Sequence, residues 1–159
     1  MYFSLIDKIE SLEPGKSIVA TKSLSMAEEY LRDHFPNFPV MPGVLMLEAM
    51  TQSAAWLIRI SEDFAHSIVV LQETQNMRFG RFVQPGQTLT LSLQQIRQDE
   101  RTTTFQAKGM VEDQTSLRAQ LTLARYNLKD RDPGMARTDE DVIKVLRQQL
   151  RLLWKPSTV

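Results

Sequence analysis

The longest apolar-rich stretch runs from Val40 to Ile60, and from Pro42 onward it is apolar on nearly every face of a helix. Its main polar interruptions are Glu48, Gln52 and Arg59. A helix without a clear polar face is usually surrounded by protein. Proline suits the first turn of a helix, because its missing N–H has no helical partner there. The pattern therefore predicts a buried helix from about Pro42 to Ile60.

After Glu62 the pattern changes to short β-branched or alternating segments. Turn-forming residues at 84–87, 98–101 and 112–114 separate four of these segments from one another, a spacing typical of an antiparallel meander. One buried helix followed by a run of strands predicts an α+β fold, with the sheet wrapped around the helix. The predicted strands are residues 67–71, 77–83, 88–96, 102–111 and 116–126.

The N-terminal part contains a turn at residues 13–16, a short apolar segment before it and an alternating segment, 17–25, after it. Ser25 is a candidate N-cap for a short helix ending at Leu31, with Glu28 completing a capping box. The following stretch, 34–43, is too rich in proline to form a regular element.

A second helix is expected at the C-terminus. Residues 129–134 resemble a linker, and Thr138 with three acidic residues after it is a strong helix start. The positions that follow form one apolar stripe, which predicts docking on the domain or on a partner subunit. We therefore expect one domain over residues 1–127 and a linker with an amphipathic helix over 128–159.

Composition restricts the possible functions. The 159 residues are 42% hydrophobic and 24% charged, as in ordinary globular proteins, and 19 basic residues balance 19 acidic ones. Nothing in this balance favours nucleic acid binding. The chain has no cysteine, which excludes disulfides and thiol nucleophiles. No signal peptide is visible, and the longest apolar stretch is too polar to span a membrane, so we expect a cytoplasmic protein.

The candidate chemistry lies around the start of the buried helix. His34 is in the rigid loop before it, and Gly43 lies in its first turn, where backbone N–H groups lack helical partners and favour negative charge. Glu48 follows roughly 9 Å along the helix axis from Pro42. Gln52 is one turn further on the same face, within reach of a hydrogen bond to Glu48.

These groups suit proton abstraction beside a carbonyl with loss of a β-hydroxyl. A neutral histidine is a suitable general base, and a carboxyl among apolar neighbours tends to stay protonated as a general acid. Plainer interpretations remain open at this point. His34 also fits a packed loop residue, and Glu48 also fits a structural ion pair with Arg59 or Arg32.

A family resemblance adds to this interpretation. The signature of the 3-hydroxyacyl-acyl-carrier-protein dehydratases of fatty acid synthesis closely resembles HFPNFPVMPGVLMLEAMTQ, residues 34–52. Segments 4–9, 13–16 and 77–86 are similar to further family segments in matching order, so the resemblance covers about residues 4–127. It implies the hot-dog fold, a long helix wrapped by an antiparallel sheet.

The resemblance also implies roles for individual residues. His34 would remove the C2 proton, Glu48 would protonate the departing hydroxyl, the Gly43 N–H would hold the thioester carbonyl and Gln52 would orient Glu48. The family's site lies between two subunits of a homodimer, and many members form trimers of dimers. The implied partner is an acyl carrier protein carrying a 3-hydroxyacyl phosphopantetheine thioester, with no cofactor and no metal.

The chain departs from the family pattern at several positions. The family commonly has glycine in place of Asp33 and Asn37, and often aspartate in place of Gln75 and Gln87. Asparagine tolerates positive φ, so Asn37 is a mild change. A carboxylate at Asp33 is expected to weaken the neighbouring His34 as a base near neutrality.

Two arginines are candidates for carrier docking. Acyl carrier proteins are acidic, so an enzyme without net charge needs a local cationic surface to attract one. Arg78 and Arg81 lie in the family-like segment 77–86, and alternation along a strand would place them on opposite faces. At least one of them therefore also fits a structural or ordinary solvated arginine.

Other functions on the same fold remain as alternatives. A thioesterase or an enoyl-CoA hydratase would keep the fold and change the reaction. A non-catalytic acyl-binding subunit would keep only the fold, although the joint presence of His34, Gly43, Glu48 and Gln52 argues against it.

Overall fold

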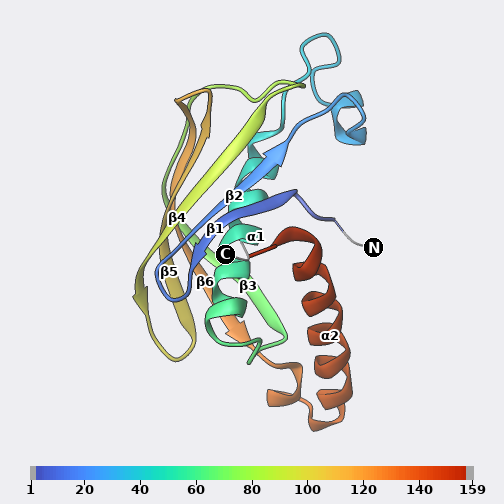
Figure 1. The fold of residues 1–159 in the computed structure, drawn as a ribbon, viewed down its shortest axis with the longest axis vertical. Coiled ribbons are helices and arrows are strands. Elements are labelled where there is room, and N and C mark those ends of the chain that lie inside the picture. The colour runs from blue at the N-terminus through green and yellow to red at the C-terminus, as the bar shows by residue number, and fades with distance from the viewer. Residues whose placement is uncertain (1–2, 157–159) are drawn as a thin grey trace.

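The computed structural model describes residues 3–156 and contains a six-stranded antiparallel sheet in the order β1-β2-β4-β5-β6-β3. Figure 1 shows the sheet curving around the long helix α1, with the second helix, α2, beside it. The helices are α1 Gly43–Ser61 and α2 Ala136–Leu153, with 3-10 turns η1 Glu29–Arg32, η2 Leu128–Asp130 and η3 Pro133–Met135. The strands are β1 Lys8–Glu13, β2 Ser17–Ser23, β3 Ile68–Phe79, β4 Thr88–Gln98, β5 Thr102–Val111 and β6 Gln114–Tyr126.

Helix α1 is the centre of the core, as its apolar composition predicts. Ala49, Met50 and Leu57 are fully buried on it, and the inward residues of the sheet, among them Leu91 and Phe105, are equally inaccessible. Each large apolar side chain buried in this way contributes about 1.5–3 kcal/mol to stability. A long helix wrapped by an antiparallel sheet is the expected hot-dog arrangement, so the predicted α+β class is confirmed.

The expected meander is correct only for β4, β5 and β6. The segments expected as separate strands at 67–71 and 77–83 are joined in one strand, β3, which ends at Phe79 and leaves residues 80–83 outside it. Register shifts interrupt β3 between Leu71 and Glu73 and between Gln75 and Arg78. This strand pairs with β6 at the far edge of the sheet, while β4 pairs with β2. Turn residues between two segments show that the chain changes direction, but they do not determine which strands become neighbours.

The expected helix capped by Ser25 is wrong. Only the 3-10 turn η1 forms, and the Ser25 hydroxyl accepts from the Ala27 N–H at 3.1 Å. The Glu28 carboxylate accepts instead from the buried Lys22 ammonium at 2.7 Å. A buried cation needs a paired anion, and this requirement outweighs a local capping box. Burial next to Glu28 raises the pKa of Tyr30 above its usual range.

Helix α2 is attached to the rest of the chain through a buried carboxylate. Asp139, expected only as a favourable helix-start residue, accepts from the Ser67 hydroxyl and from the N–H groups of Leu128 and Lys129. Burial raises its pKa, but these hydrogen bonds outweigh burial and hold the pKa of Asp139 below its usual value. Residues 157–159 of the expected C-terminal segment lie outside the described residues.

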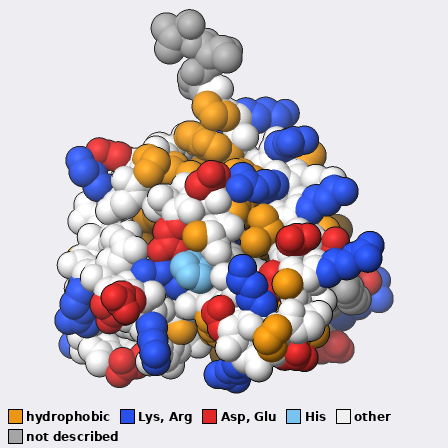
Figure 2. All heavy atoms as spheres, turned by 90° about the horizontal axis from the view of Figure 1, so that it is seen from below, with side chains coloured by type: hydrophobic (Ala, Val, Ile, Leu, Met, Phe, Trp, Pro, Cys, Tyr) orange, Lys and Arg blue, Asp and Glu red, His pale blue; other side chains and the backbone are white. Residues whose placement is uncertain are grey.

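Charged side chains are distributed over the surface without a strong bias. Figure 2 shows acidic and basic side chains intermixed over one whole face, consistent with equal numbers of the two charges. Within residues 3–156, no helix is both long and apolar enough to cross a membrane.

Candidate active site

His34 lies in the proline-rich loop and faces a small cavity at the N-terminal end of α1. The cavity has a volume of about 240 Å³ and is also lined by Gly43, Met46, Phe79 and Arg81. The His34 ring is half-buried and lies 4.7 Å from the ring of Phe35, measured between centroids. Within residues 3–156 the imidazole makes no hydrogen bond. A catalytic histidine is normally oriented by such a bond.

The loop that carries His34 reverses sharply at the next residue. Phe35 has a φ of 49°, and its carbonyl accepts from the Phe38 N–H at 2.8 Å. In this loop the residue with positive φ is therefore Phe35 and not Asn37. The loop is attached to the sheet side through the Met41 N–H, which donates to the Val83 carbonyl at 2.9 Å.

Gly43 is the first residue of α1 and belongs to the same cavity as His34. Its backbone N–H is in the first turn, where helical partners are lacking. A Cβ at this position would lie 2.7 Å from Cε1 of Phe79. Glycine therefore allows the aromatic ring to lie directly against the start of the helix.

Glu48 and Gln52 form the pair expected from their spacing on α1. The Gln52 amide donates to the Glu48 carboxylate at 3.2 Å. It also donates to the Phe3 carbonyl at 2.9 Å, and its own carbonyl accepts from the Leu5 N–H at 2.8 Å. The N-terminal segment thus fixes Gln52, which in turn orients Glu48.

The expected apolar surroundings of Glu48 are not present in the single chain. Its neighbours Ala49 and Met50 point into the core, whereas Glu48 is exposed. Consecutive helix positions are about 100° apart around the axis, so adjacent residues face different environments. Counting apolar neighbours in the sequence therefore overstated the burial of this carboxyl.

His34 and Glu48 line separate cavities in one chain. Glu48 lies in a cavity of about 270 Å³ that does not include His34 or Gly43. Five residues separate Gly43 from Glu48, which corresponds to a rotation of about 140° around the helix. A single chain therefore presents the candidate base and the candidate acid on different sides of α1.

Arg81 and Arg78 have different environments. Arg81 lies beyond the end of β3, where its guanidinium donates to Gln114 at 2.6 Å and lies 3.7 Å from the Glu112 carboxylate. It lines the His34 cavity. The expectation that both arginines lie on one alternating strand is thus wrong, because β3 ends at Phe79.

Arg78 belongs to a row of basic residues on the outer face of the sheet. It lies opposite Arg118 on β6, which lies opposite Lys108 on β5. Within residues 3–156 no carboxylate forms an ion pair with any of these three side chains. Like charges in register on neighbouring strands repel, so the row is suited to an anionic partner.

Several cavity residues were not identified from the sequence. Phe79 and Phe82 line the His34 cavity, whereas the sequence indicated a site role in segment 77–86 only for its arginines. Trp56 and Arg59 line the Glu48 cavity and lie eight and eleven residues after Glu48, so helical periodicity would have found them. Leu146 and Gln149 of α2 also line it, and no local pattern indicates this contact.

The groups of the two cavities together suit acid–base chemistry. They provide an imidazole, a helix-start N–H and a carboxyl oriented by an amide, which are the components of an elimination next to a carbonyl. Within the described residues, no group of three or more His, Asp or Glu side chains is placed to hold a metal ion.

Comparison with known proteins identifies similar sequences over most of the chain. The FabA-like domain model matches residues 1–120. A 3-hydroxyacyl-acyl-carrier-protein dehydratase FabZ from Pediococcus pentosaceus is 40% identical over 117 residues, covering 74% of this chain and 78% of the relative. A protein of the same name from Janthinobacterium sp. is 36% identical over 133 residues, covering 82% of this chain and 85% of the relative.

Solved structures with low sequence identity share the fold. The dehydratase heterocomplex ApeI:P from Xenorhabdus doucetiae matches with a TM-score of 0.67 at 15% identity, over 83% of this chain and 89% of that one. A mutant thioesterase from Pseudomonas aeruginosa matches with a TM-score of 0.59 at 18% identity, over 74% of this chain and 79% of that one. At these identities the likeness concerns the fold alone.

Proposed function

Since this chain belongs to the FabA-like family, we propose that it dehydrates 3-hydroxyacyl-acyl-carrier-protein to trans-2-enoyl-acyl-carrier-protein in fatty acid synthesis. In this reaction His34 takes a proton from C2, and Glu48 gives a proton to the C3 hydroxyl, which leaves as water. The Gly43 N–H stabilises the negative charge that develops on the thioester oxygen. The central observation is the hydrogen bond from Gln52 that orients Glu48 on α1.

The proposed working unit is a homodimer, or a trimer of such dimers, with each site shared by two subunits. Three features support this proposal. His34 and Glu48 line separate cavities of one chain, and His34 has no hydrogen-bonding partner within residues 3–156. The 12-residue strand β3 is a sheet edge with Val70, Met77 and Phe79 exposed, and the unpaired backbone groups of such an edge favour pairing with another chain.

The proposed partner is an acyl carrier protein, recognised by Arg78 and Arg81. Arg81 lies beside the cavity of His34, where the phosphopantetheine arm would enter. Arg78 extends the basic surface along the row with Arg118 and Lys108, which would attract an acidic carrier. We propose that this reaction takes place in the cytoplasm.

A turnover assay with product identification tests the proposed reaction. Purified protein is incubated with 3-hydroxyacyl-acyl-carrier-protein, and the ultraviolet absorbance of a conjugated enoyl thioester and the amount of free thiol are both followed. Dehydration gives the enoyl thioester without free thiol. Release of free thiol without an enoyl product would identify a thioesterase instead, and the absence of both would leave a binding subunit.

A further inference from the structure

The cavity beside Glu48 runs along one face of α1. Its α1 residues follow Glu48 at helical spacings of three and four, and eleven residues separate Glu48 from Arg59, about 16 Å along the axis. An elongated cavity that begins at the candidate acid has the shape required for an extended acyl chain. The α1 residues that line it are Glu48, Thr51, Gln52, Ala55, Trp56 and Arg59.

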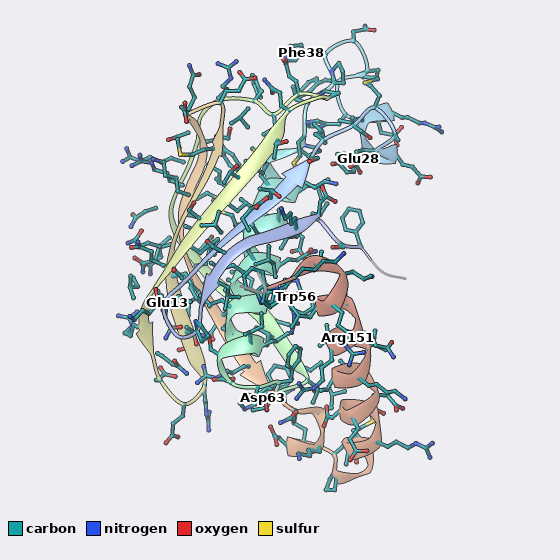
Figure 3. All side chains as sticks on the ribbon, in the orientation of Figure 1. Glu13, Glu28, Phe38, Trp56, Asp63 and Arg151 are labelled. Atoms are coloured by element: carbon teal, nitrogen blue, oxygen red, sulfur yellow. The ribbon has the colours of Figure 1, made fainter. Side chains whose placement is uncertain are left out.

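Helix α2 forms the wall opposite this face. Leu146 and Gln149 line the cavity together with Trp56, whose side chain is seen in Figure 3 beside α1. The helix is held in place on both sides of these residues. Asp139 binds Ser67 and η2 near its start, and Leu153 near its end is only 8% exposed within the core. The wall is therefore a fixed part of the fold.

This wall lies outside residues 1–120, the part of the chain that the family model matches. We propose that Leu146 and Gln149 determine which acyl chains this protein accepts, by limiting the space along the side of the chain site opposite α1. The inference rests on the proposed dehydratase function, because it takes Glu48 as the point where the reacting carbons lie.

The chemistry of the lining indicates the direction of the preference. Trp56 and Leu146 provide apolar contacts, whereas Arg59, eleven residues along α1 from Glu48, places a charged group at the far end of the cavity. An acyl methyl group gains stability from apolar contacts and gains little beside a charged side chain. Short and medium acyl chains are therefore preferred over long saturated ones.

Substitutions at Leu146 test this role, with Val145 as the matched control. Leu146 faces the cavity, whereas Val145 is 47% exposed on the same helix. Catalytic efficiency, kcat/KM, is measured with N-acetylcysteamine thioesters of β-hydroxy acids whose acyl chains span about 4 to 16 carbons. Leu146→Ala should raise the ratio of long-chain to short-chain efficiency by about tenfold or more, because added space admits further methylenes. Leu146→Phe should lower that ratio, and Val145→Ala should leave it unchanged.

The outcomes separate this inference from the proposed function. If both Leu146 variants are active and keep the wild-type ratio of long-chain to short-chain kcat/KM, α2 does not determine chain length. The proposed dehydration would be unaffected by that result. If the wild-type protein turned over neither these mimics nor 3-hydroxyacyl-acyl-carrier-protein, dehydration would be wrong. Calorimetric binding of saturated acyl N-acetylcysteamine thioesters would then decide the inference. Tighter binding of long chains by Leu146→Ala than by Leu146→Phe would support the role of Leu146 in limiting the acyl chain. Equal binding by the two variants would contradict that role.

Discussion

At the scale of single residues, the site depends on how each functional group is held. The Gln52 amide makes one hydrogen bond to Glu48 and two to the backbone of Phe3 and Leu5. The two backbone bonds hold Gln52 in place, and the third orients the acid. This pair was predictable because positions four apart share a helix face. The exposure of Glu48 was not, since neighbouring residues in the sequence face different sides of the helix.

Removing either proton-transfer group should nearly abolish dehydration. His34→Ala and Glu48→Gln are each expected to lower kcat by about 10²–10⁴-fold, the usual contribution of a general acid or base. Gln52→Ala should cause a smaller loss, because the Glu48 carboxyl is still present but is no longer held in its orientation. The assay follows enoyl thioester formation, with circular dichroism to confirm folding.

Two matched controls accompany these variants. His66, the other histidine of the chain, bonds to Glu62 at 3.1 Å and lies outside both cavities, so His66→Ala should retain turnover. Glu140→Gln on the exposed part of α2 should do the same. Near-normal turnover by His34→Ala or Glu48→Gln would refute the assigned roles.

At the scale of secondary structure elements, the sequence predicted the types of element better than their neighbours. Helix α1 was found because its apolar residues cover nearly every face, and β5 because clear turns flank it. The single strand β3 was split in two, since its register shifts interrupt the alternation. Its pairing with β6 depends on long-range packing that local pattern does not contain.

The attachment of α2 predicts a pH-dependent stability. Asp139 has a lowered pKa in the folded protein, so its contribution is fully present above the unfolded value of about 3.9 and is lost as the pH falls through the lower folded value. Asp139→Asn should therefore lower the urea midpoint at pH 7. The difference from wild type should shrink as the pH falls below about 4, because the carboxyl of the unfolded wild-type chain then takes up a proton and that of the folded chain follows at lower pH.

Urea unfolding at neutral and acidic pH measures this effect. Asp141→Asn, an exposed neighbour on the same helix, is the control and should leave the midpoint nearly unchanged. An Asp139→Asn deficit of the same size at both pH values would show that the carboxylate charge is not responsible.

The two arginines should respond differently to removal. Arg78→Gln is expected to raise KM several-fold for carrier-protein substrates and to weaken their salt dependence, with little effect on short thioester mimics. Arg81→Gln should affect both substrate types, because Arg81 lines the His34 cavity and bonds to Gln114. Arg137→Gln, exposed on α2, is the control. Equal losses for both substrate types in Arg78→Gln would exclude a docking role for that residue.

At the scale of the whole molecule, one chain has the components of the site but does not bring them together. The core is complete around α1, yet exposed aromatic side chains gather near the His34 loop, and β3 is a sheet edge that exposes Val70, Met77 and Phe79. Such exposed apolar surfaces usually mark an interface. A twofold dimer would supply each cavity with groups from a second subunit. From the sequence, only the family resemblance indicated that the site is shared between two subunits.

Activity of mixed subunits tests the shared site most directly. His34→Ala and Glu48→Gln chains with different affinity tags are co-expressed, and hybrids carrying both tags are purified and assayed for enoyl thioester formation. Each hybrid dimer should contain one intact site of two, so its activity should recover to about half that of wild type. Hybrids as inactive as either parent would contradict a site built from His34 of one subunit and Glu48 of the other.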